Sequence, residues 1–473
     1  MVFSSSLFLL YFFPVFLLAY LFTPVKFKNY TILIASVLFY AWGAPKFIFG
    51  LFAVLVADYF LGNKIYESQG RKRKIFLTIS IIINVGMLLY FKYANFFVEN
   101  LNDVLHLFNI ENVNWTKVVL PIGISFFTFQ EMSYTIDIYR GEHKPLQKFT
   151  DYMLFIFMFS HLIAGPIVTY HILADDIVDR RHQLNNDYRL LGLYRFIIGM
   201  AKKVLIANVL GEVADDVFKL QPADINSTTA WLGILAYTFQ LYFDFSGYSD
   251  MAIGIGKFLG FNFPENFNSP YISQSITEFW RRWHMTLSSW MKNYLYIPLG
   301  GNKVSVLRMF LNLWIVFLIS GFWHGAEWTF LVWGAYHGFF IVLDKLFLIK
   351  LLKPIGKIPR TIFTFIIAMV GWVFFRAADL SYAIGFIKKM FSFQFNYSEV
   401  IYSNRFEFTM LLAIIFSFAA LSDKIAQCQW KGLNISNNNF ILSFRVILSI
   451  SLFILALADI TSSGFNPFIY FRF

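Results

Sequence analysis

The sequence is short of charge and nearly free of cysteine. Charged residues make up 14% of the 473 residues, whereas a soluble domain carries roughly 25%. Hydrophobic residues make up 58%, and the mean hydropathy is +0.59. The single cysteine, Cys428, excludes an internal disulfide and a cysteine-cluster metal site. This composition indicates an integral membrane protein.

Several common catalytic and nucleotide-binding motifs are also missing. The sequence contains no GxSxG elbow, no Walker loop, no HExxH and no GxGxxG that opens a helix after a strand. The glycines of GIGKFLG, at 254–260, are a weak coincidence. The net charge of +11 does not indicate nucleic acid as a partner, because the basic residues fall in loops and follow the positive-inside pattern.

Long apolar stretches recur along the whole chain. Examples are residues 7–22, 75–89, 362–375 and 440–457, and counting them predicts about ten to twelve membrane spans of roughly 20 residues. The first stretch has no basic segment before it and no small-residue cleavage site, so we expect it to be a retained span. Membrane lipids are therefore expected neighbours of most of the chain.

The distribution of basic residues predicts the orientation. Lysine and arginine gather at Lys26 and Lys28, at 64–74 and at 345–360, whereas 98–116 has neither. Cytoplasmic loops are the basic ones, so the segment 98–116 should be extracytoplasmic. Counting spans from these points places both termini outside.

The middle of the chain differs from its ends. Between residues 121 and 338 the apolar segments carry polar and ionisable side chains, namely Gln130, Glu131, Asp137, His161, Asp244, Ser246, Asp250, the block 278–284 and His324. Ionisable groups at membrane depth are costly and normally line an aqueous cavity. Short, broken helices around a thinned core would suit such a region.

The stretch TEFWRRWHMTLSSWMKNYLYIPLGG, at 277–301, is the first candidate for chemistry. On one helix His284 would lie a turn from Trp280 and Ser288, with Arg281 and Arg282 beside it. An amphipathic interfacial helix with tryptophan anchors explains this pattern equally well. The mixture of aromatic and basic residues also suits an anionic donor that approaches from the cytoplasm.

The second candidate is ISGFWHGAEWTFLVWGAYHG, at 319–338, in which His324 follows an apolar run. A single histidine in an apolar context is usually a packed core residue. A neutral imidazole can nevertheless accept a proton from a hydroxyl, as a general base in acyl transfer does. His337 lies on another helical face and is expected to be structural. A metal held by His284 and His324 would need carboxylates that the sequence does not place beside them, so no metal is expected.

Five blocks together carry a resemblance to a known family. They are PIGISFFTFQEMSYTIDIYRGE, FSHLIAGPIVTY, YFDFSGYSDMAIGIGKFLGFNFPENFNSPY, FWRRWHMTLSSWMKNYLYIPLGG and SGFWHGAEWTFLVWGAYHG. In this order they resemble the membrane-bound O-acyltransferase superfamily, most of all its bacterial alginate and peptidoglycan O-acetylation branch. The teichoic acid D-alanylation proteins are more distant.

The resemblance implies a fold and a set of site residues. The expected fold is an all-α polytopic membrane protein with about 11 transmembrane helices and short re-entrant helices in a ring around a thin core with a funnel. It forms one domain, 1–473, with amino-terminal spans (1–118), a catalytic core (119–345) and carboxyl-terminal spans (346–473). His324 matches the catalytic histidine and His284 a second polar position. Supporting or tunnel-lining residues are Trp280, Arg281, Arg282, Trp283, Ser288, Trp323, Asp244, Ser246 and Gln130.

The resemblance also gives a hypothesis for the ending FIYFRF, at 468–473. Relatives end on a similar FxYxxF pattern, which implies that Tyr470 can carry an acyl group. An aromatic belt at the membrane interface is the competing interpretation.

The implied activity is O-acetylation of an extracytoplasmic polysaccharide by a protein of the bacterial cytoplasmic membrane. The implied donor is acetyl-CoA, and the implied partner is an esterase-like protein outside the membrane. Two alternatives stay open: a transporter or flippase for a lipid-linked sugar, and a D-alanyl or other acyl transferase of the same superfamily.

Overall fold

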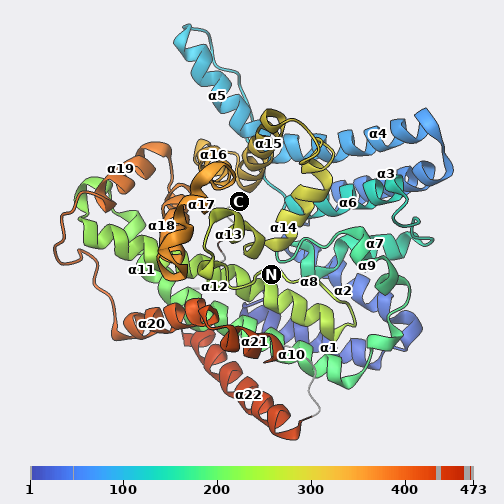
Figure 1. Ribbon diagram of the computed structural model, residues 1–473. Helices are drawn as coiled ribbons and strands as arrows, with labels where there is room; N and C mark the ends of the chain where they lie inside the picture. The colour runs from blue at the N-terminus through green and yellow to red at the C-terminus, as the bar shows by residue number, and fades with distance from the viewer. Residues whose placement is uncertain (1–2, 46, 433–437, 463–468, 470–473) are drawn as a thin grey trace. The chain divides into compact units, whose positions relative to one another are not determined.

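The computed structural model describes residues 3–45, 47–432, 438–462 and 469 (Figure 1). Within these residues every regular element is helical, which confirms the all-α class. The chain divides into two compact units, one made mainly of Leu9–Leu184 with Gly260–Phe263, the other of Asn185–Leu259 with Pro264–Phe473. The expectation of one domain for residues 1–473 stays a prediction.

The described residues of the first unit form nine α-helices. They are α1 (Phe13–Phe22), α2 (Lys28–Gly43), α3 (Ile48–Glu67), α4 (Gly70–Leu88), α5 (Ala94–Leu107), α6 (Ile124–Arg140), α7 (Phe149–Phe157), α8 (Phe159–Leu162) and α9 (Tyr170–Val178).

Polar side chains in the first unit pair across helices, as expected where no water is available. On α4, Ser80 donates to the Thr135 hydroxyl on α6 at 3.1 Å, and Asn84 donates to Asp58 on α3. A Cβ added at Gly62 would lie 2.7 Å from the Tyr134 ring, so this glycine lets α3 and α6 approach closely.

The second unit contains the remaining α-helices of the described chain. They are α10 (Asn186–Ala201), α11 (Asn208–Lys219), α12 (Ser227–Phe258), α13 (Ile276–Arg282), α14 (Met285–Trp290), α15 (Val306–His324), α16 (Trp328–Leu343), α17 (Ile349–Leu352), α18 (Lys357–Arg376), α19 (Leu380–Met390), α20 (Asn404–Phe418), α21 (Asp423–Gly432) and α22 (Asn439–Ser462).

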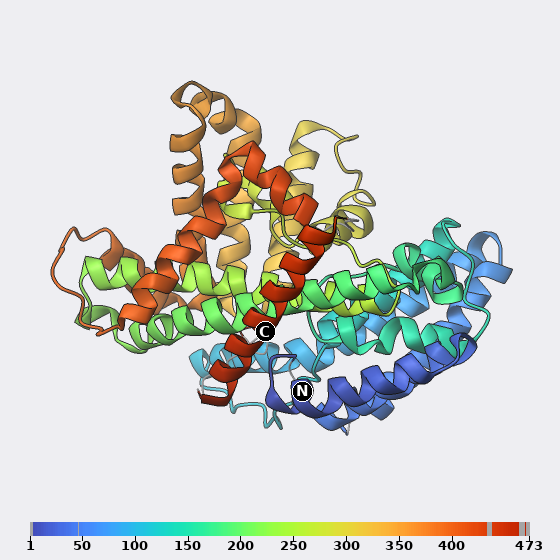
Figure 2. The same ribbon diagram turned by 90° about the horizontal axis from the view of Figure 1, so that it is seen from below.

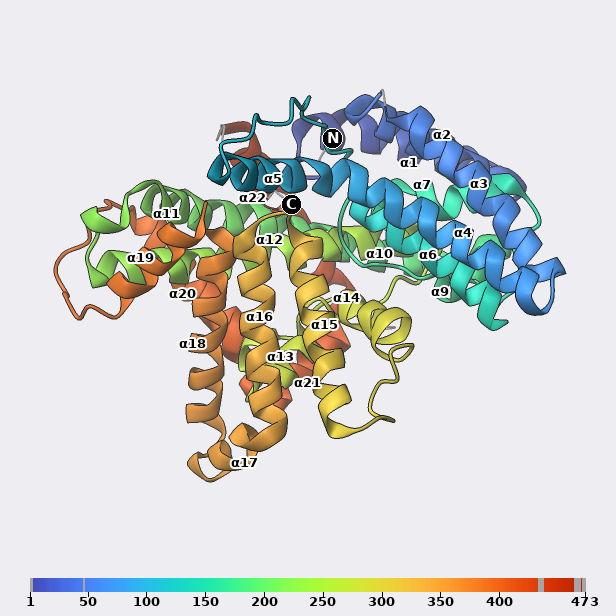
Figure 3. The same ribbon diagram turned by 90° about the horizontal axis from the view of Figure 1, so that it is seen from above.

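Two glycine pairs join α10 to α12. A Cβ at Gly192 would lie 2.6 Å from the carbonyl oxygen of Gly254, and one at Gly199 would lie 2.4 Å from that of Gly247. Only glycine allows backbones this close, which is how small residues strengthen helix contacts in membranes. Figure 2 shows α22, in red, running across the green α10, which it contacts. Figure 3 shows α15, α16 and α18 side by side.

Six described helices are long and apolar enough to cross a membrane. They are Ile48–Glu67, Gly70–Leu107, Val306–His324, Lys357–Arg376, Asn404–Leu421 and Asn439–Ser462, and the apolar helix Phe8–Phe22 is shorter. A multi-pass membrane protein is therefore confirmed, whereas the count of about 11 spans and the orientation of the termini stay predictions. Helices α7, α8, α9, α13 and α14 are all too short to span, as expected for the central part of the chain.

Candidate functional site

His324 is the last residue of α15 and is 5% exposed. The approach of α15 to α16 fixes its position, because a Cβ at Gly321 would lie 2.4 Å from the Phe330 carbonyl oxygen of α16. At Gly325, the residue after the histidine, a Cβ would lie 2.1 Å from the Phe330 ring. Both glycines therefore let the helix end close on α16 and hold the imidazole in the interior.

Aromatic rings enclose the imidazole of His324. Ring centroids of Trp323, Trp333 and Phe375 lie 4.9, 5.0 and 5.3 Å from it, all in edge-on arrangements. Trp333 comes from α16 and Phe375 from α18, so three helices contribute to the enclosure. Such an environment excludes water and strengthens any electrostatic interaction that a reacting group makes inside it.

His284 does not lie on one continuous helix, so that expectation is wrong. Helix α13 ends at Arg282, α14 begins at Met285, and His284 between them has φ 44° and ψ 54°. A non-glycine residue in this left-handed region costs on the order of 1–3 kcal/mol and needs support from its surroundings.

The support comes from Asn266, in the segment that connects α12 to α13. Its carbonyl oxygen accepts the Met285 N–H at 2.9 Å, and its side-chain oxygen accepts the Thr286 hydroxyl at 2.8 Å. The same side-chain oxygen lies 3.0 Å from His284 Nδ1. The side-chain nitrogen of Asn266, Nδ2, donates to the Ser249 hydroxyl at 3.0 Å. These tertiary hydrogen bonds stabilise the break between α13 and α14. The local pattern of residues 277–301 does not predict them.

Burial determines the charge of the His284 ring, and the contact with Asn266 determines which ring nitrogen carries the proton. Complete burial lowers the pKa of His284 to about 3, because the charged form loses its hydration. The ring is therefore neutral, and its one proton is on Nδ1, which faces an oxygen that can only accept. Nε2 then carries the lone pair.

One indole connects the two predicted histidines. The Trp323 ring centroid lies 6.3 Å from that of His284 and 4.9 Å from that of His324. The structure thus brings together the three residues His284, Trp323 and His324. His284 also meets Phe245 of α12 edge-on at 4.8 Å, which joins this long helix to the same cluster.

Two further predicted tryptophans extend the cluster. The ring centroids of Trp280 and Trp333 lie 5.5 Å apart, and those of Trp283 and Trp372 lie 4.9 Å apart. The Ser288 hydroxyl donates to the Trp280 carbonyl at 2.9 Å, which ties α14 back to α13.

The two predicted arginines are placed differently. Arg282 donates to Glu278 at 2.9 Å and to the Asn268 carbonyl at 3.1 Å, so its guanidinium is engaged locally. Arg281 is exposed. Neither has a described contact with the two histidines.

The other predicted supporting residues are dispersed. Asp244 and Ser246 are buried on α12, and Asp244 pairs with Lys203, which the sequence did not single out. Gln130 is buried on α6, in the first unit. Tyr470 lies outside the described residues.

Sequence reasoning missed four contributors to the site: Asn266, Trp333, Trp372 and Phe375. No signal marks Asn266 in PENFN, and Phe375 lies in an ordinary apolar span. His337 is buried in the same aromatic cluster, 5.2 Å from Trp333 and 5.3 Å from Trp280 by ring centroids. Its expected structural role stays a prediction.

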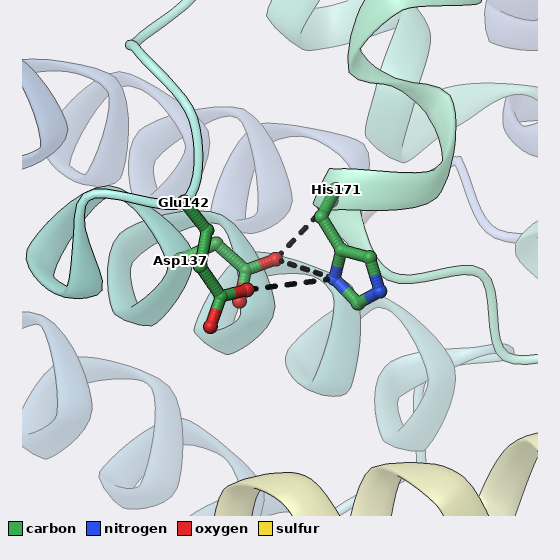
Figure 4. Close-up of side chains that lie close together, drawn as sticks. All are labelled: Asp137, Glu142 and His171. Carbon is green, nitrogen blue, oxygen red and sulfur yellow. Dashed lines mark hydrogen bonds and ion pairs between the residues drawn. The ribbon is translucent and has the colours of Figure 1, made fainter.

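One group in the described chain has a composition that can hold a metal ion: Asp137, Glu142 and His171 (Figure 4). His171 Nδ1 lies 3.1 Å from Asp137 and 3.9 Å from Glu142, and the His171 backbone N–H also donates to Asp137. The buried Asp137 carboxylate thus satisfies the first turn of α9. Its hydrogen bond raises the pKa of His171, and an ordinary ion pair explains the group. The expectation of no metal stays a prediction.

Comparison with known proteins gives a consistent result. The protein-family model for the membrane-bound O-acyltransferase family matches residues 142–378, a range that includes His284 and His324. The chain is 46% identical to a protein of Azotobacter vinelandii named probable alginate O-acetylase AlgI, over 83% of this chain and 78% of that one.

Two more relatives mark the range of similarity. A protein of Helicobacter pylori named peptidoglycan O-acetyltransferase is 39% identical, over 82% of this chain and 80% of its own length. A teichoic acid D-alanyltransferase of Streptococcus thermophilus is 30% identical, over 52% of this chain and 61% of its own. The similarity is thus higher and more extensive for the two O-acetylating relatives.

Proposed function

Since the chain belongs to the membrane-bound O-acyltransferase family, we propose that it passes an acetyl group from a cytoplasmic donor to an extracytoplasmic polysaccharide. The chain is an O-acetyltransferase, and the names of the relatives, alginate O-acetylase and peptidoglycan O-acetyltransferase, support a polysaccharide as the proposed acceptor. The observation that carries the proposed site is the enclosure of His324 by three aromatic rings, one of which, Trp323, also lies beside His284.

In this proposal His324 is the general base. Acetyl-CoA is the donor that suits the chemistry, because its thioester is activated for acyl transfer. The imidazole takes the proton of an attacking hydroxyl, the hydroxyl oxygen forms a bond to the acetyl carbon, and the C–S bond breaks. The imidazolium then returns the proton to the departing thiolate. The dry aromatic enclosure protects the thioester from hydrolysis.

His284 acts as a supporting residue. As the neutral Nδ1–H form held by Asn266, it presents the lone pair of Nε2 as a fixed hydrogen-bond acceptor. Arg281 is the better of the two arginines for the phosphates of the donor, because Arg282 is already paired with Glu278. Trp280, Trp283, Ser288, Ser246 and Gln130 are proposed only as lining or packing residues.

The first acceptor in this proposal is the Tyr470 hydroxyl. A phenol with a pKa near 10 is barely ionised at neutral pH and needs a base such as His324. The acetyl-tyrosine so formed is a phenyl ester, which passes its acyl group to a sugar hydroxyl and regenerates the phenol. An esterase-like partner outside the membrane would catalyse this second step.

The base is tested with membranes that contain His324→Gln, supplied with radiolabelled acetyl-CoA. We expect transfer of label to fall by about 10²–10⁴-fold, the usual effect of losing a general base. His337→Gln is the matched control, because it alters a histidine of the same aromatic cluster. An equal loss in both variants, or none in His324→Gln, would contradict the assignment.

The tyrosine is tested with Tyr470→Phe, which removes one hydroxyl and keeps the aromatic ring. We expect acetylation of the polysaccharide to stop, whereas the exposed Tyr397→Phe should behave as the unaltered protein. Unchanged activity in Tyr470→Phe would leave Tyr470 an interfacial anchor. Labelled D-alanine in place of acetate tests for D-alanyl transfer, the activity of the more distant relatives. Transfer of the acetyl group itself distinguishes an enzyme from a flippase.

A further inference from the structure

A buried ion pair joins two segments of the second unit. Lys203 lies in the π-helical turn Lys202–Ala207 and Asp244 lies in α12, and each is 2% exposed. Lys203 Nζ is 2.9 Å from one Asp244 oxygen, Oδ1, and also donates to the Asn208 side-chain oxygen at 2.8 Å. Removing two charges from water costs about as much as their attraction returns, so such a pair adds little net stability.

The second oxygen of Asp244 makes a contact of a different kind. Asp244 Oδ2 accepts the backbone N–H of Ile469 at 3.1 Å, across 225 positions of sequence. Ile469 is 8% exposed and belongs to the hydrophobic core of this unit. A residue four positions from the last one is therefore held in the interior by a carboxylate and by apolar packing.

Lys203 explains why this contact can be strong. A carboxylate in an apolar interior stays ionised only with a cation beside it, and an ionised oxygen accepts a hydrogen bond about twice as strong as a neutral one. Asp244 Oδ1 pairs with the Lys203 ammonium, and Oδ2 accepts the hydrogen bond from the Ile469 amide. One oxygen therefore keeps the cation beside the carboxylate while the other binds the backbone.

We propose that the Lys203–Asp244 pair is a docking site for the carboxyl-terminal segment of this chain, and that it positions the neighbouring Tyr470 for acyl transfer. The second half rests on the proposed function, whereas the docking does not. Six residues lie between the end of α22 at Ser462 and Ile469, so an undocked Ile469 could move as far as about 25 Å from that end over seven chain steps. Docking at Ile469 would also confine the residue that follows it, because consecutive Cα atoms are about 3.8 Å apart. Confinement of this kind raises the effective concentration of a reacting group.

Docking is tested by the reactivity of a cysteine at position 469. The full-length chain with Cys428→Ser has no other thiol, and Ile469→Cys keeps the backbone N–H that Asp244 holds. In membranes, we expect a maleimide to label this cysteine slowly. Asp244→Ala should raise the labelling rate about tenfold or more, because the loss of a hydrogen bond to a charged group shifts the docked fraction by that order.

Asp244→Ala removes the carboxylate beside the buried Lys203 ammonium and can disturb folding, so the double variant Lys203→Met with Asp244→Leu is tested beside it. It removes both charges and keeps apolar volume, and we expect the same rise in labelling with a normal yield of folded protein. Asp215→Asn is the control, because it breaks the Arg376–Asp215 pair at 2.7 Å, which does not contact Ile469. Labelling rates that do not rise in the double variant would overturn the docking site.

The positioning role has a separate readout, the mass of the carboxyl-terminal peptide after reaction with acetyl-CoA. We expect an added acetyl group on Tyr470 in the unaltered protein and at least a tenfold lower yield in the double variant, with binding of the donor unchanged. Equal acetylation in both proteins would overturn positioning. If the unaltered protein never carries acetyl on Tyr470, the acetyl-tyrosine step of the proposed function fails, while the labelling experiment still decides docking.

Discussion

Asn266 offers a test of how the site is held, because this one residue supports the break between α13 and α14 with its side chain and its backbone carbonyl. In Asn266→Ala the His284 Nδ1–H, the Thr286 hydroxyl and the Ser249 hydroxyl each lose a partner. Each lost hydrogen bond between buried groups costs about 1–3 kcal/mol, so a loss of about 3–5 kcal/mol in the free energy of unfolding is expected after partial relaxation. The backbone bond from Met285 to the residue 266 carbonyl remains, so the fold should survive.

Activity should fall further than stability explains. Without Asn266 the neutral His284 is free to carry its proton on Nε2, and the acceptor that we assign to it disappears. We expect the acetyl transfer rate of the folded fraction to fall at least about tenfold, because one lost orienting hydrogen bond is worth about 1.4 kcal/mol or more.

Two measurements on purified protein in detergent check this prediction: thermal unfolding, and acetyl transfer per folded molecule. Thr286→Val is the matched control, because it removes one hydrogen bond to the same Asn266 oxygen and leaves His284 in contact. It should lose about 1 kcal/mol of stability and keep its rate. A rate in folded Asn266→Ala that equals that of the control would refute the orienting role.

Two further predictions concern packing and pH. In Gly321→Ala the new methyl group would lie 2.4 Å from the Phe330 carbonyl oxygen, so α15 must move away from α16. We expect the free energy of unfolding, measured by thermal unfolding, to fall by about 1–3 kcal/mol and the activity to fall with it. Gly338→Ala is the control and should cost less, because its methyl group would lie 3.2 Å from Phe317. The pKa of His171 is raised in the folded state by its hydrogen bond with Asp137, so its contribution to stability is complete below about pH 6.5 and is lost as the pH rises through the folded pKa. His171→Asn should remove this decline from unfolding midpoints measured between about pH 5 and 8, and a decline that persists would contradict the assignment.

The sequence predicts the features of this chain that depend on local pattern. The apolar spans, the short helices of the central part and the place of His324 at the end of an apolar helix all follow from hydropathy and glycine spacing. Their signals lie within about twenty consecutive residues, which is the length of one span.

Features that depend on distant contacts could not be predicted in this way. The helical pattern of 277–301 is strong, yet the helix is interrupted at His284, where Asn266 accepts hydrogen bonds from the residues around the break. Likewise, nothing near Asp244 indicates that its second oxygen binds an amide 225 positions away. Tertiary hydrogen bonds decide the structure at both points, and the first of them, at His284, lies beside the proposed catalytic histidine.

The glycine contacts between α10 and α12 also determine how slowly this part of the protein opens. Where Gly192 meets Gly254 and Gly199 meets Gly247, the two backbones touch and no solvent layer separates them. Backbone amides at these contacts can exchange hydrogen for deuterium only when the two helices come apart. Their exchange rates should therefore report the largest openings of the unit. Since Asp244 lies less than one turn before Gly247, we expect the carboxylate that holds the Ile469 amide to belong to the part of this unit that opens last.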